Sequence, residues 1–333
     1  MNLAQYPRRR YTAGRTPIEY LANFSRAVGG PEIYVKRDDL LGLTGGGNKT
    51  RKLEFLVGDA LARDADTLIT CGAVQSNHCR LTLAAAVKEG LKCRLVLAEA
   101  TPGAYRPDAG GNVFLYHLLG VERITVVPWG TDLPAALAAA AAEAADEGRR
   151  PYIIPLGGSN PIGALGYVDC GQEIAAQMAE AGTAFDNIVV AGGSAGTQGG
   201  LLLGLRSEGS RAPVTGISVL NPRAVQENLV YEMVGKTADY LGAALPVKRE
   251  EIVVRDEYLG PGYTLPTGEM VAAVRLLAGT EGILLDPSYT GKAMAGLIDL
   301  ARRGVFPAGS RVLFLHTGGW PALFAHQDLF LDK

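Results

Sequence analysis

The sequence predicts an α/β protein built from mostly parallel β-sheets, and three observations support this fold class. Short apolar runs alternate with helical patterns along most of the 333 residues, which is the order of elements in α/β folds. Most of these runs are apolar at consecutive positions, as in strands that helices cover on both faces. Glycine accounts for 43 residues, well above the usual share of ~7%, which predicts many tight turns and close backbone approaches.

The elements can be placed in chain order from these patterns. The expected strands lie at residues 33–35, 67–70, 95–97, 124–127, 152–154, 188–190, 216–219 and 312–315. The expected helices lie at residues 52–63, 79–90, 135–147, 166–181 and 293–302. Sites in such folds form at the carboxyl ends of strands, so we expect the chemistry at glycine turns that follow strands.

The composition disfavours several classes of protein. Lys plus Arg is 32 and Asp plus Glu is 34, so the formal net charge is -2 and we expect no nucleic acid or membrane surface as partner. No apolar run reaches the ~20 residues of a membrane helix, and no secretory signal is visible. The four cysteines form no C-x-x-C pair and the four histidines no metal-binding pair. We therefore expect no metal site and a cytoplasmic protein with reduced thiols.

A lysine within a glycine-rich segment is the first candidate for chemistry. Residues 42–50 read GLTGGGNKT, in which Lys49 closely follows three glycines. Glycine lets a ligand approach the backbone, and a lysine becomes nucleophilic when burial or a nearby cation lowers its pKa. The segment nearly matches a phosphate-binding P-loop, but Asn48 interrupts Gly-Lys-Thr and the preceding strand ends too early, near Lys36. A lysine that merely starts a helix is the structural alternative.

A second glycine segment predicts an anion site. Residues 192–200 read GGSAGTQGG between an apolar run and a helical pattern. The free N–H groups at a helix N-terminus attract anions, and Ser194 and Thr197 add hydroxyl donors. The spacing does not match G-x-G-x-x-G, which weakens a dinucleotide interpretation. A tight strand–helix turn without a ligand is the alternative.

Three shorter motifs also follow expected strands or begin expected helices. They read QSNH at 75–78, DPSYTGK at 286–292 and HTGGW at 316–320. Ser76 or Asn77 could act as a helix cap alone, and Tyr289 could stack on a ligand or pack in a core. Taken together, the motifs offer a reactive amine, a phosphate cup, an aromatic platform and hydroxyl groups. Pyridoxal phosphate (PLP) requires this set of groups.

On these motifs the sequence resembles the fold-type II PLP enzymes, in the group of D-cysteine desulfhydrase and 1-aminocyclopropane-1-carboxylate (ACC) deaminase. The resemblance rests on KRDD at 36–39, GGNK at 46–49, QSNH at 75–78, GSAGT at 193–197, YTGK at 289–292 and HTGG at 316–319, in the family's order. Residues 43–56 and 71–93 are most similar to L-cysteate sulfo-lyases. The resemblance implies a tryptophan synthase β-like fold with two open twisted α/β domains. Residues 1–50 and 161–333 would form the large PLP-binding domain, residues 51–160 a small inserted domain, and the enzyme would be a homodimer.

The resemblance also implies roles for single residues. Lys49 would hold PLP as the internal aldimine and move the α-proton, Tyr289 would stack on the pyridine ring, and Thr317 would face its nitrogen. The cofactor-binding set would be Lys49, Asn77, Ser194, Ala195, Gly196, Thr197, Tyr289, Thr290 and Thr317. The catalytic set would be Lys49, Ser76, Tyr263 and Tyr289. An amino-acid substrate would contact Thr44, Gln75, Ser76, Ser159, Asn160 and Tyr263.

One departure bears on the reaction. ACC deaminases carry a glutamate after the stacking tyrosine, where this chain has Thr290. A hydroxyl does not keep the pyridine nitrogen protonated, so ACC deamination is disfavoured. The expected reaction is β-elimination of L-cysteate to pyruvate, sulfite and ammonia, through an external aldimine and an aminoacrylate. D-cysteine desulfhydrase activity, which releases sulfide, is the main alternative, and a nucleotide-dependent enzyme or a non-catalytic amino-acid sensor are less favoured. Trp320 is expected to shape the pocket wall.

Overall fold

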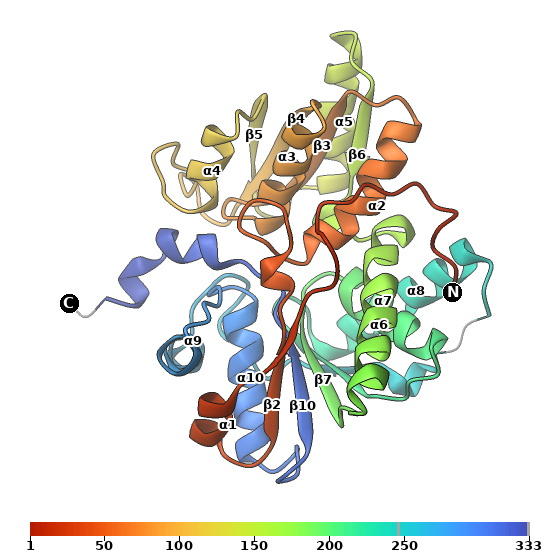
Figure 1. The fold of residues 1–333 in the computed structure, drawn as a ribbon. Helices are drawn as coiled ribbons and strands as arrows, with labels where there is room; N and C mark the ends of the chain where they lie inside the picture. Colours follow the sequence, from red (N-terminus) through yellow and green to blue (C-terminus); the bar gives the residue numbers. More distant parts are fainter. Residues whose placement is uncertain (245–246, 332–333) are drawn as a thin grey trace.

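Two β-sheets, each covered by helices, make up the protein (Figure 1). The computed structural model describes residues 1–244 and 247–331. The larger sheet has the strand order β1 (Ile18–Tyr20), β2 (Glu32–Lys36), β10 (Arg311–Leu315), β7 (Asn187–Gly192), β8 (Val214–Ser218) and β9 (Val253–Arg255). The smaller has the order β5 (Arg123–Pro128), β4 (Lys92–Glu99), β3 (Thr67–Ala73) and β6 (Pro151–Ile154). All strand pairs are parallel except β1 with β2.

Helices cover both faces of each sheet, which explains the consecutive apolar positions. On β7, Val189 packs with one layer of the core and Val190 with the opposite layer, because successive side chains on a strand point to opposite faces. The first layer contains α1 (Ala22–Val28), α9 (Gly268–Glu281) and α10 (Thr290–Arg302), and the second contains α6 (Pro161–Ala181), α7 (Gly196–Ser207) and α8 (Arg223–Leu241).

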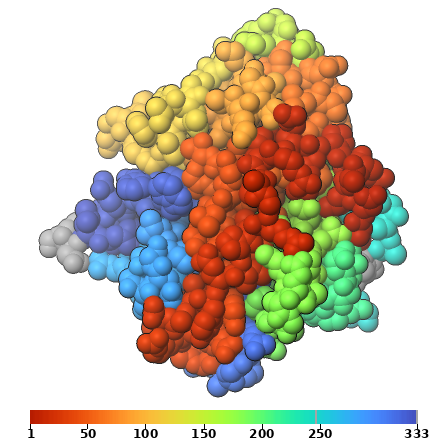
Figure 2. Space-filling model, in the orientation of Figure 1, coloured from red at the N-terminus to blue at the C-terminus, as the bar shows by residue number. Residues whose placement is uncertain are grey.

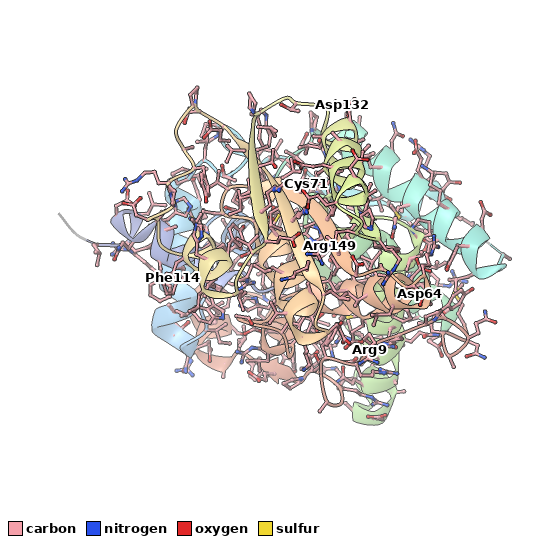
Figure 3. All side chains as sticks on the ribbon, turned by 90° about the horizontal axis from the view of Figure 1, so that it is seen from above. Arg9, Asp64, Cys71, Phe114, Asp132 and Arg149 are labelled. Atoms are coloured by element: carbon pink, nitrogen blue, oxygen red, sulfur yellow. The ribbon has the colours of Figure 1, made fainter. Side chains whose placement is uncertain are left out.

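The small sheet is covered in the same way. One face packs on α2 (Lys49–Ala62), α3 (Asn77–Lys88) and α4 (Asn112–Leu118), and the other on α5 (Leu133–Asp146). Figure 3 views this sheet from above, with Cys71 on β3 and Asp132 at the start of α5. Asp132 caps that helix, because its carboxylate accepts the backbone N–H of Ala135 at 3.0 Å.

The predicted fold class is confirmed. Each expected strand overlaps an observed strand, and each expected helix overlaps an observed helix. The patterns missed β1 and β9, which have three residues each and lie at the edges of the large sheet. They also missed α1, α4, α8 and α9. None of the helices in the described residues is long and apolar enough to cross a membrane.

The small sheet with its helices (the small unit) and the large sheet with its helices (the large unit) are bridged by α2 and by the N-terminal segment. The predicted domain boundary at residue 51 falls inside α2, a continuous helix that contributes side chains to the cores of both units. The N-terminal segment, red in Figure 2, lies on the surface of both units. Its Arg8 donates hydrogen bonds to Glu54 of α2 at 2.7 Å and to Asp169 of α6 at 2.8 Å. The division into residues 1–50 with 161–333 and residues 51–160 stays a prediction.

Candidate active site

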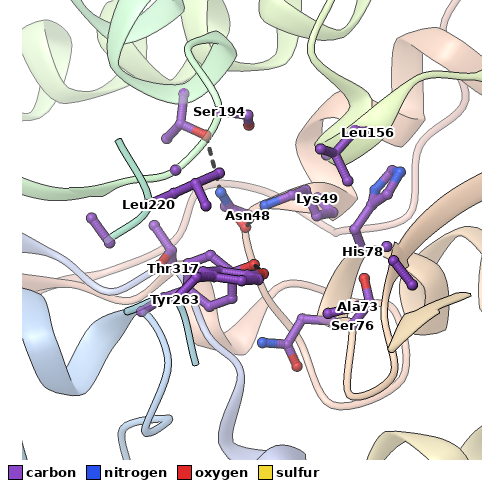
Figure 4. A pocket seen from close by; sticks show the side chains of 18 of the residues that line it. Asn48, Lys49, Ala73, Ser76, His78, Leu156, Ser194, Leu220, Tyr263 and Thr317 are labelled. Carbon is purple, nitrogen blue, oxygen red and sulfur yellow. Dashed lines mark hydrogen bonds between the residues drawn. The ribbon is translucent and has the colours of Figure 1, made fainter. Parts of the chain in front are cut away.

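A cavity lies where the carboxyl ends of strands from both sheets meet. Its lining includes Ala73 at the end of β3, Ala98 on β4 and Gly193 just after β7. Figure 4 shows side chains from both sheets around it. Of the residues predicted from the motifs, Lys49, Ser76, Asn77, Ser194, Thr197, Tyr263, Tyr289 and Thr317 line this cavity. Sites in open parallel sheets are expected at this end of the strands.

Lys49 is the first residue of α2 and reaches into the cavity. The turn before it requires glycine, because Gly46 has a φ of +63° and a Cβ there would lie 1.7 Å from the Asp39 carbonyl oxygen. Lys49 Nζ donates to Asn48 Oδ1 at 3.0 Å, and Asn48 Nδ2 donates to Thr197 Oγ1 at 3.0 Å. The amine is thus linked through one side chain to the second glycine segment. Burial lowers the pKa of Lys49 to about 8, although Asp286 opposes this shift.

The second glycine segment forms a cup at the N-terminus of α7. The N-cap residue Ala195 offers no side-chain acceptor, and Ser159 Oγ from another segment accepts the Gly196 N–H. The other N–H groups of the first turn are available to an anion. A Cβ at Gly196 would lie 2.7 Å from Ser159 Oγ and 3.1 Å from Lys52 Nζ. Glycine therefore leaves room for these polar groups to approach the helix start. Ala195 and Gly196 themselves are buried.

Lys52 brings a positive charge to this cup. Its side chain is fully buried, and its Nζ donates to the Gly157 carbonyl at 3.1 Å. Among the described residues no carboxylate pairs with it. Burial and the neighbouring Lys49 ammonium hold the pKa of Lys52 well below its usual value. A positive charge on Lys52 is therefore unfavourable until a counter-ion is bound beside it, so this site is suited to an anionic ligand.

Two tyrosines form an aromatic wall. Tyr289 lies beside Gly193, where a Cβ would be 3.4 Å from its Cε1. The hydroxyl groups of Tyr263 and Tyr289 are hydrogen-bonded to each other. Burial raises the pKa of Tyr263 to about 12 and that of Tyr289 well above its usual value. Both phenols are therefore neutral hydrogen-bonding groups at neutral pH.

The start of α3 presents a hydroxyl and an amide to the cavity. Ser76 caps α3, since its Oγ accepts the backbone N–H of Cys79 at 3.1 Å. Its hydroxyl hydrogen is left for another acceptor. Asn77 Oδ1 accepts from Asn112 Nδ2 at 2.9 Å, which orients the amide and leaves Asn77 Nδ2 as a donor. Ser76 thus combines both alternatives weighed from the sequence, a helix cap and a cavity residue.

The two threonines predicted at the cofactor ring differ in position. Thr317 lines the cavity. Thr290 is fully buried and does not line the cavity. Its hydroxyl is turned to Asp286 instead: it donates to Asp286 Oδ1 at 2.7 Å and accepts the Asp286 backbone N–H at 2.7 Å. The Asp286 carboxylate also accepts the backbone N–H of Thr290 at 2.7 Å, and so holds the start of α10. Thr317 is therefore the better placed of the two for contact with a bound ring.

Four of the predicted substrate residues do not line the cavity. Thr44 is exposed, and Asn160 caps α6 by accepting the Gly163 N–H at 2.8 Å. Ser159 Oγ accepts the Gly196 N–H at 2.7 Å, which places it at the cup instead. Gln75 uses its amide to hold the loop before α4, accepting from Asn112 N at 2.7 Å and donating to Gly110 O at 3.0 Å.

The expectation that Trp320 shapes the pocket wall is wrong. Its ring packs edge-on against Phe324, 6.1 Å away between centroids, and it does not line the cavity. The tryptophan that does line it is Trp129, at the turn after β5. No local motif marks Trp129, because it reaches the site only through the packing of the two units.

Lys52, Asn112 and His78 were also absent from the predicted site. Lys52 could have been found, because a residue three positions after Lys49 lies on the same face of a helix. His78 lines the cavity, and its Nε2 lies 2.7 Å from Thr70 Oγ1. Thr70 donates its own hydrogen to the Ile154 carbonyl at 2.8 Å, so His78 must donate from Nε2. Burial and the two lysine ammonium groups lower the pKa of His78 well below its usual value, and the ring is neutral.

These groups fit pyridoxal phosphate. The cofactor needs an amine for its aldehyde, an anion site for its phosphate and a flat surface for its ring. Lys49 supplies the amine, the start of α7 together with Lys52 supplies the anion site, and Tyr289 supplies the surface. Asn77 Nδ2 remains as a donor for a ring oxygen. No cluster of His, Cys, Asp or Glu in the described part of the chain could hold a metal ion.

The lowered pKa of Lys49 predicts how the stability of the cofactor-free protein depends on pH. The pKa falls from 10.5 to about 8 on folding, so between these values the unfolded chain binds more protons at this residue. The free energy of unfolding contributed by Lys49 therefore rises with pH across this window and is constant, and lowest, below it. Urea unfolding at several pH values should show this rise in the cofactor-free wild type relative to Lys49→Met. Parallel pH profiles of the two proteins would contradict it.

The comparisons with known proteins agree with this fit. The family model described as "Pyridoxal-phosphate dependent enzyme" matches residues 10–318. D-cysteine desulfhydrases of Yersinia pestis (strain Pestoides F) and Yersinia pseudotuberculosis serotype O:1b (strain IP 31758) are each 45% identical over 327 residues, covering 98% of this chain and 97% of theirs.

Solved structures extend the likeness to three dimensions. A structure described as an ACC deaminase homologue is 41% identical, with a TM-score of 0.88 and coverage of 98% of this chain and 97% of that one. O-ureido-L-serine synthase shares the fold at 21% identity, with a TM-score of 0.66 over 94% of this chain and 92% of that one. The chain therefore belongs to the family of pyridoxal-phosphate dependent enzymes of fold type II, and its cofactor is pyridoxal phosphate.

Proposed function

We propose that the protein is a PLP-dependent lyase that eliminates the β-thiol of D-cysteine and yields sulfide, pyruvate and ammonia. The identity of 45% to D-cysteine desulfhydrases over nearly the whole chain supports this substrate. This proposal favours D-cysteine over L-cysteate, the substrate that the motifs suggested first.

The observation that carries the proposal is the charge of the cavity lining. Among the described lining residues Lys49 is the one cation, since His78 is neutral, and Lys49 is needed for the cofactor. Lys52 lies at the phosphate cup. A sulfonate bears a fixed negative charge and would be buried beside Tyr263, Trp129 and other uncharged groups, which is unfavourable without a cationic partner. The thiol of cysteine is uncharged and needs no cationic partner in the cavity.

The chain's own residues would act as follows. PLP supplies the electron sink that makes the α-proton of a bound amino acid acidic. Lys49 Nζ would take that proton, since its lowered pKa keeps a usable fraction of neutral amine. The hydroxyl of Ser76 and the free N–H groups at the start of α3 would bind the substrate carboxylate. The neutral hydroxyl of Tyr263 would donate a hydrogen bond to the departing sulfur.

A product assay decides between the two substrates. Purified protein loaded with PLP is mixed separately with D-cysteine, L-cysteine and L-cysteate, and sulfide, sulfite and pyruvate are measured. We expect sulfide and pyruvate in equal amounts from D-cysteine and no sulfite from L-cysteate. Sulfite with pyruvate from L-cysteate, and no turnover of D-cysteine, would overturn the proposal and restore the interpretation drawn from the motifs.

A further inference from the structure

The inner cavity adjoins a second, outer groove, and the two share part of their lining. The outer groove is bordered by the segment before α4, by the loop after β9 and by the residues near Phe324. Both linings contain Ala73, Ala98, Trp129, Tyr263 and Tyr289. These shared residues mark the neck through which a molecule in the groove would reach Lys49. Alanines border part of the neck, so its width depends on the three aromatic side chains.

Two of these aromatics meet across the boundary between the units. Trp129 follows β5, the edge strand of the small sheet, whereas Tyr263 lies in the loop between β9 and α9. Their rings are stacked, with centroids 5.6 Å apart and an interplanar angle of 28°. Such a pair stabilises the arrangement beyond the area that it buries.

Tyr263 is the fixed half of this pair. The buried ammonium of Lys292 donates to the carbonyls of Leu259 and Gly262, at 2.7 Å and 2.8 Å, and so ties the loop to α10. Tyr263 is also hydrogen-bonded to Tyr289 and packs edge-on against it. The position of Tyr263 is therefore set within the large unit.

Trp129 is the less constrained half. Its side chain is 50% exposed, although it lines both cavities. It precedes Gly130, which has a φ of +92° and no atom within 4 Å of the place a Cβ would take. Because half of the Trp129 side chain already faces solvent, the indole has room to swing away from Tyr263 without displacing core residues.

We propose that Trp129 is a gate and specificity residue: stacked on Tyr263 it closes the neck, and it must leave the stack for a ligand to reach Lys49. Small amino acids and reagents pass on brief opening, whereas bulky ones need the indole fully displaced. The inference concerns access to the lysine-bound cofactor and does not depend on which amino acid is the substrate.

Aminooxy reagents of different size test this directly, because they attack the lysine–cofactor linkage and change its absorbance without any turnover. The measured quantity is the rate constant for O-benzylhydroxylamine divided by the rate constant for hydroxylamine, each with the PLP-loaded protein. We expect Trp129→Ala to raise this ratio about two- to tenfold. This range is the increase in the population of the open neck that the loss of one aromatic pair would cause. Trp129→Phe, which keeps a ring over Tyr263, should give an intermediate ratio.

Trp320→Phe is the matched control, since it alters the other of the two tryptophans, which lines neither cavity. Its ratio should equal that of the wild type. A ratio unchanged in Trp129→Ala would overturn the gate, whatever the product assay shows with D-cysteine. A raised ratio together with no turnover of D-cysteine would leave the gate standing and remove the proposed substrate.

Discussion

Replacement of Lys49 by alanine should abolish turnover and the covalent attachment of PLP. Lys49 is the one amine among the described residues that line the cavity, and it would both bind the aldehyde and move the α-proton. Loss of such a group typically lowers kcat by about a thousandfold or more. The absorbance of the lysine-bound cofactor should vanish, and borohydride followed by peptide mapping should find no reduced PLP on residue 49.

The surface lysine of α8 provides the control. Lys236 is exposed and pairs with Glu232 one helical turn away, so Lys236→Ala should keep full activity and the same reduced peptide as the wild type. Cofactor-dependent turnover that survives in Lys49→Ala would remove Lys49 from the reaction, and PLP mapped to another lysine would move the site.

Local motifs predicted the residues that a short segment can position by itself. Lys49 follows a glycine turn, Thr197 sits at a strand–helix junction, and Ser76 caps the helix on whose first turn Asn77 lies. In each case the strand end, the turn and the functional side chain are contiguous in sequence. A pattern in one segment is then sufficient to place the group at the carboxyl edge of a sheet.

The remaining residues depend on contacts between distant segments. Asn112 orients Asn77 across 35 positions, and Trp129 meets Tyr263 across the two units. Ser159 was expected at the substrate, but its segment lies at the start of α7, where its hydroxyl oxygen accepts the Gly196 N–H. Such placements follow from the packing of the small sheet against the large one, which the pattern of apolar residues does not encode.

The same distinction applies to the fold. β7 and β10 lie inside the large sheet, are covered on both faces and stand out as continuous apolar runs. β1 and β9 are short edge strands, and their order and register are set by the neighbours they pair with. Their three-residue segments carry no pattern strong enough to mark a strand.

Replacement of Lys52 by methionine should weaken the binding of PLP without destabilising the cofactor-free protein. Without PLP, the buried Lys52 amine has one carbonyl partner and no counter-ion among the described residues, so an apolar side chain of similar length should leave the free energy of unfolding unchanged or raise it by about 1 kcal/mol. With PLP, the phosphate loses a charge-assisted hydrogen bond, and the dissociation constant should rise about 10- to 100-fold. Cofactor titration and urea unfolding with and without PLP measure both effects.

Lys292→Met separates this effect from the general consequence of removing a buried lysine. Lys292 is equally buried, but its Nζ donates to two loop carbonyls and lies outside the cup. Its replacement leaves both carbonyls without their donor and should destabilise the protein by about 1–3 kcal/mol with or without PLP. If instead Lys52→Met destabilises both forms equally and leaves PLP affinity unchanged, Lys52 acts as a structural residue like Lys292, and the start of α7 must bind the phosphate through its backbone and hydroxyl groups alone.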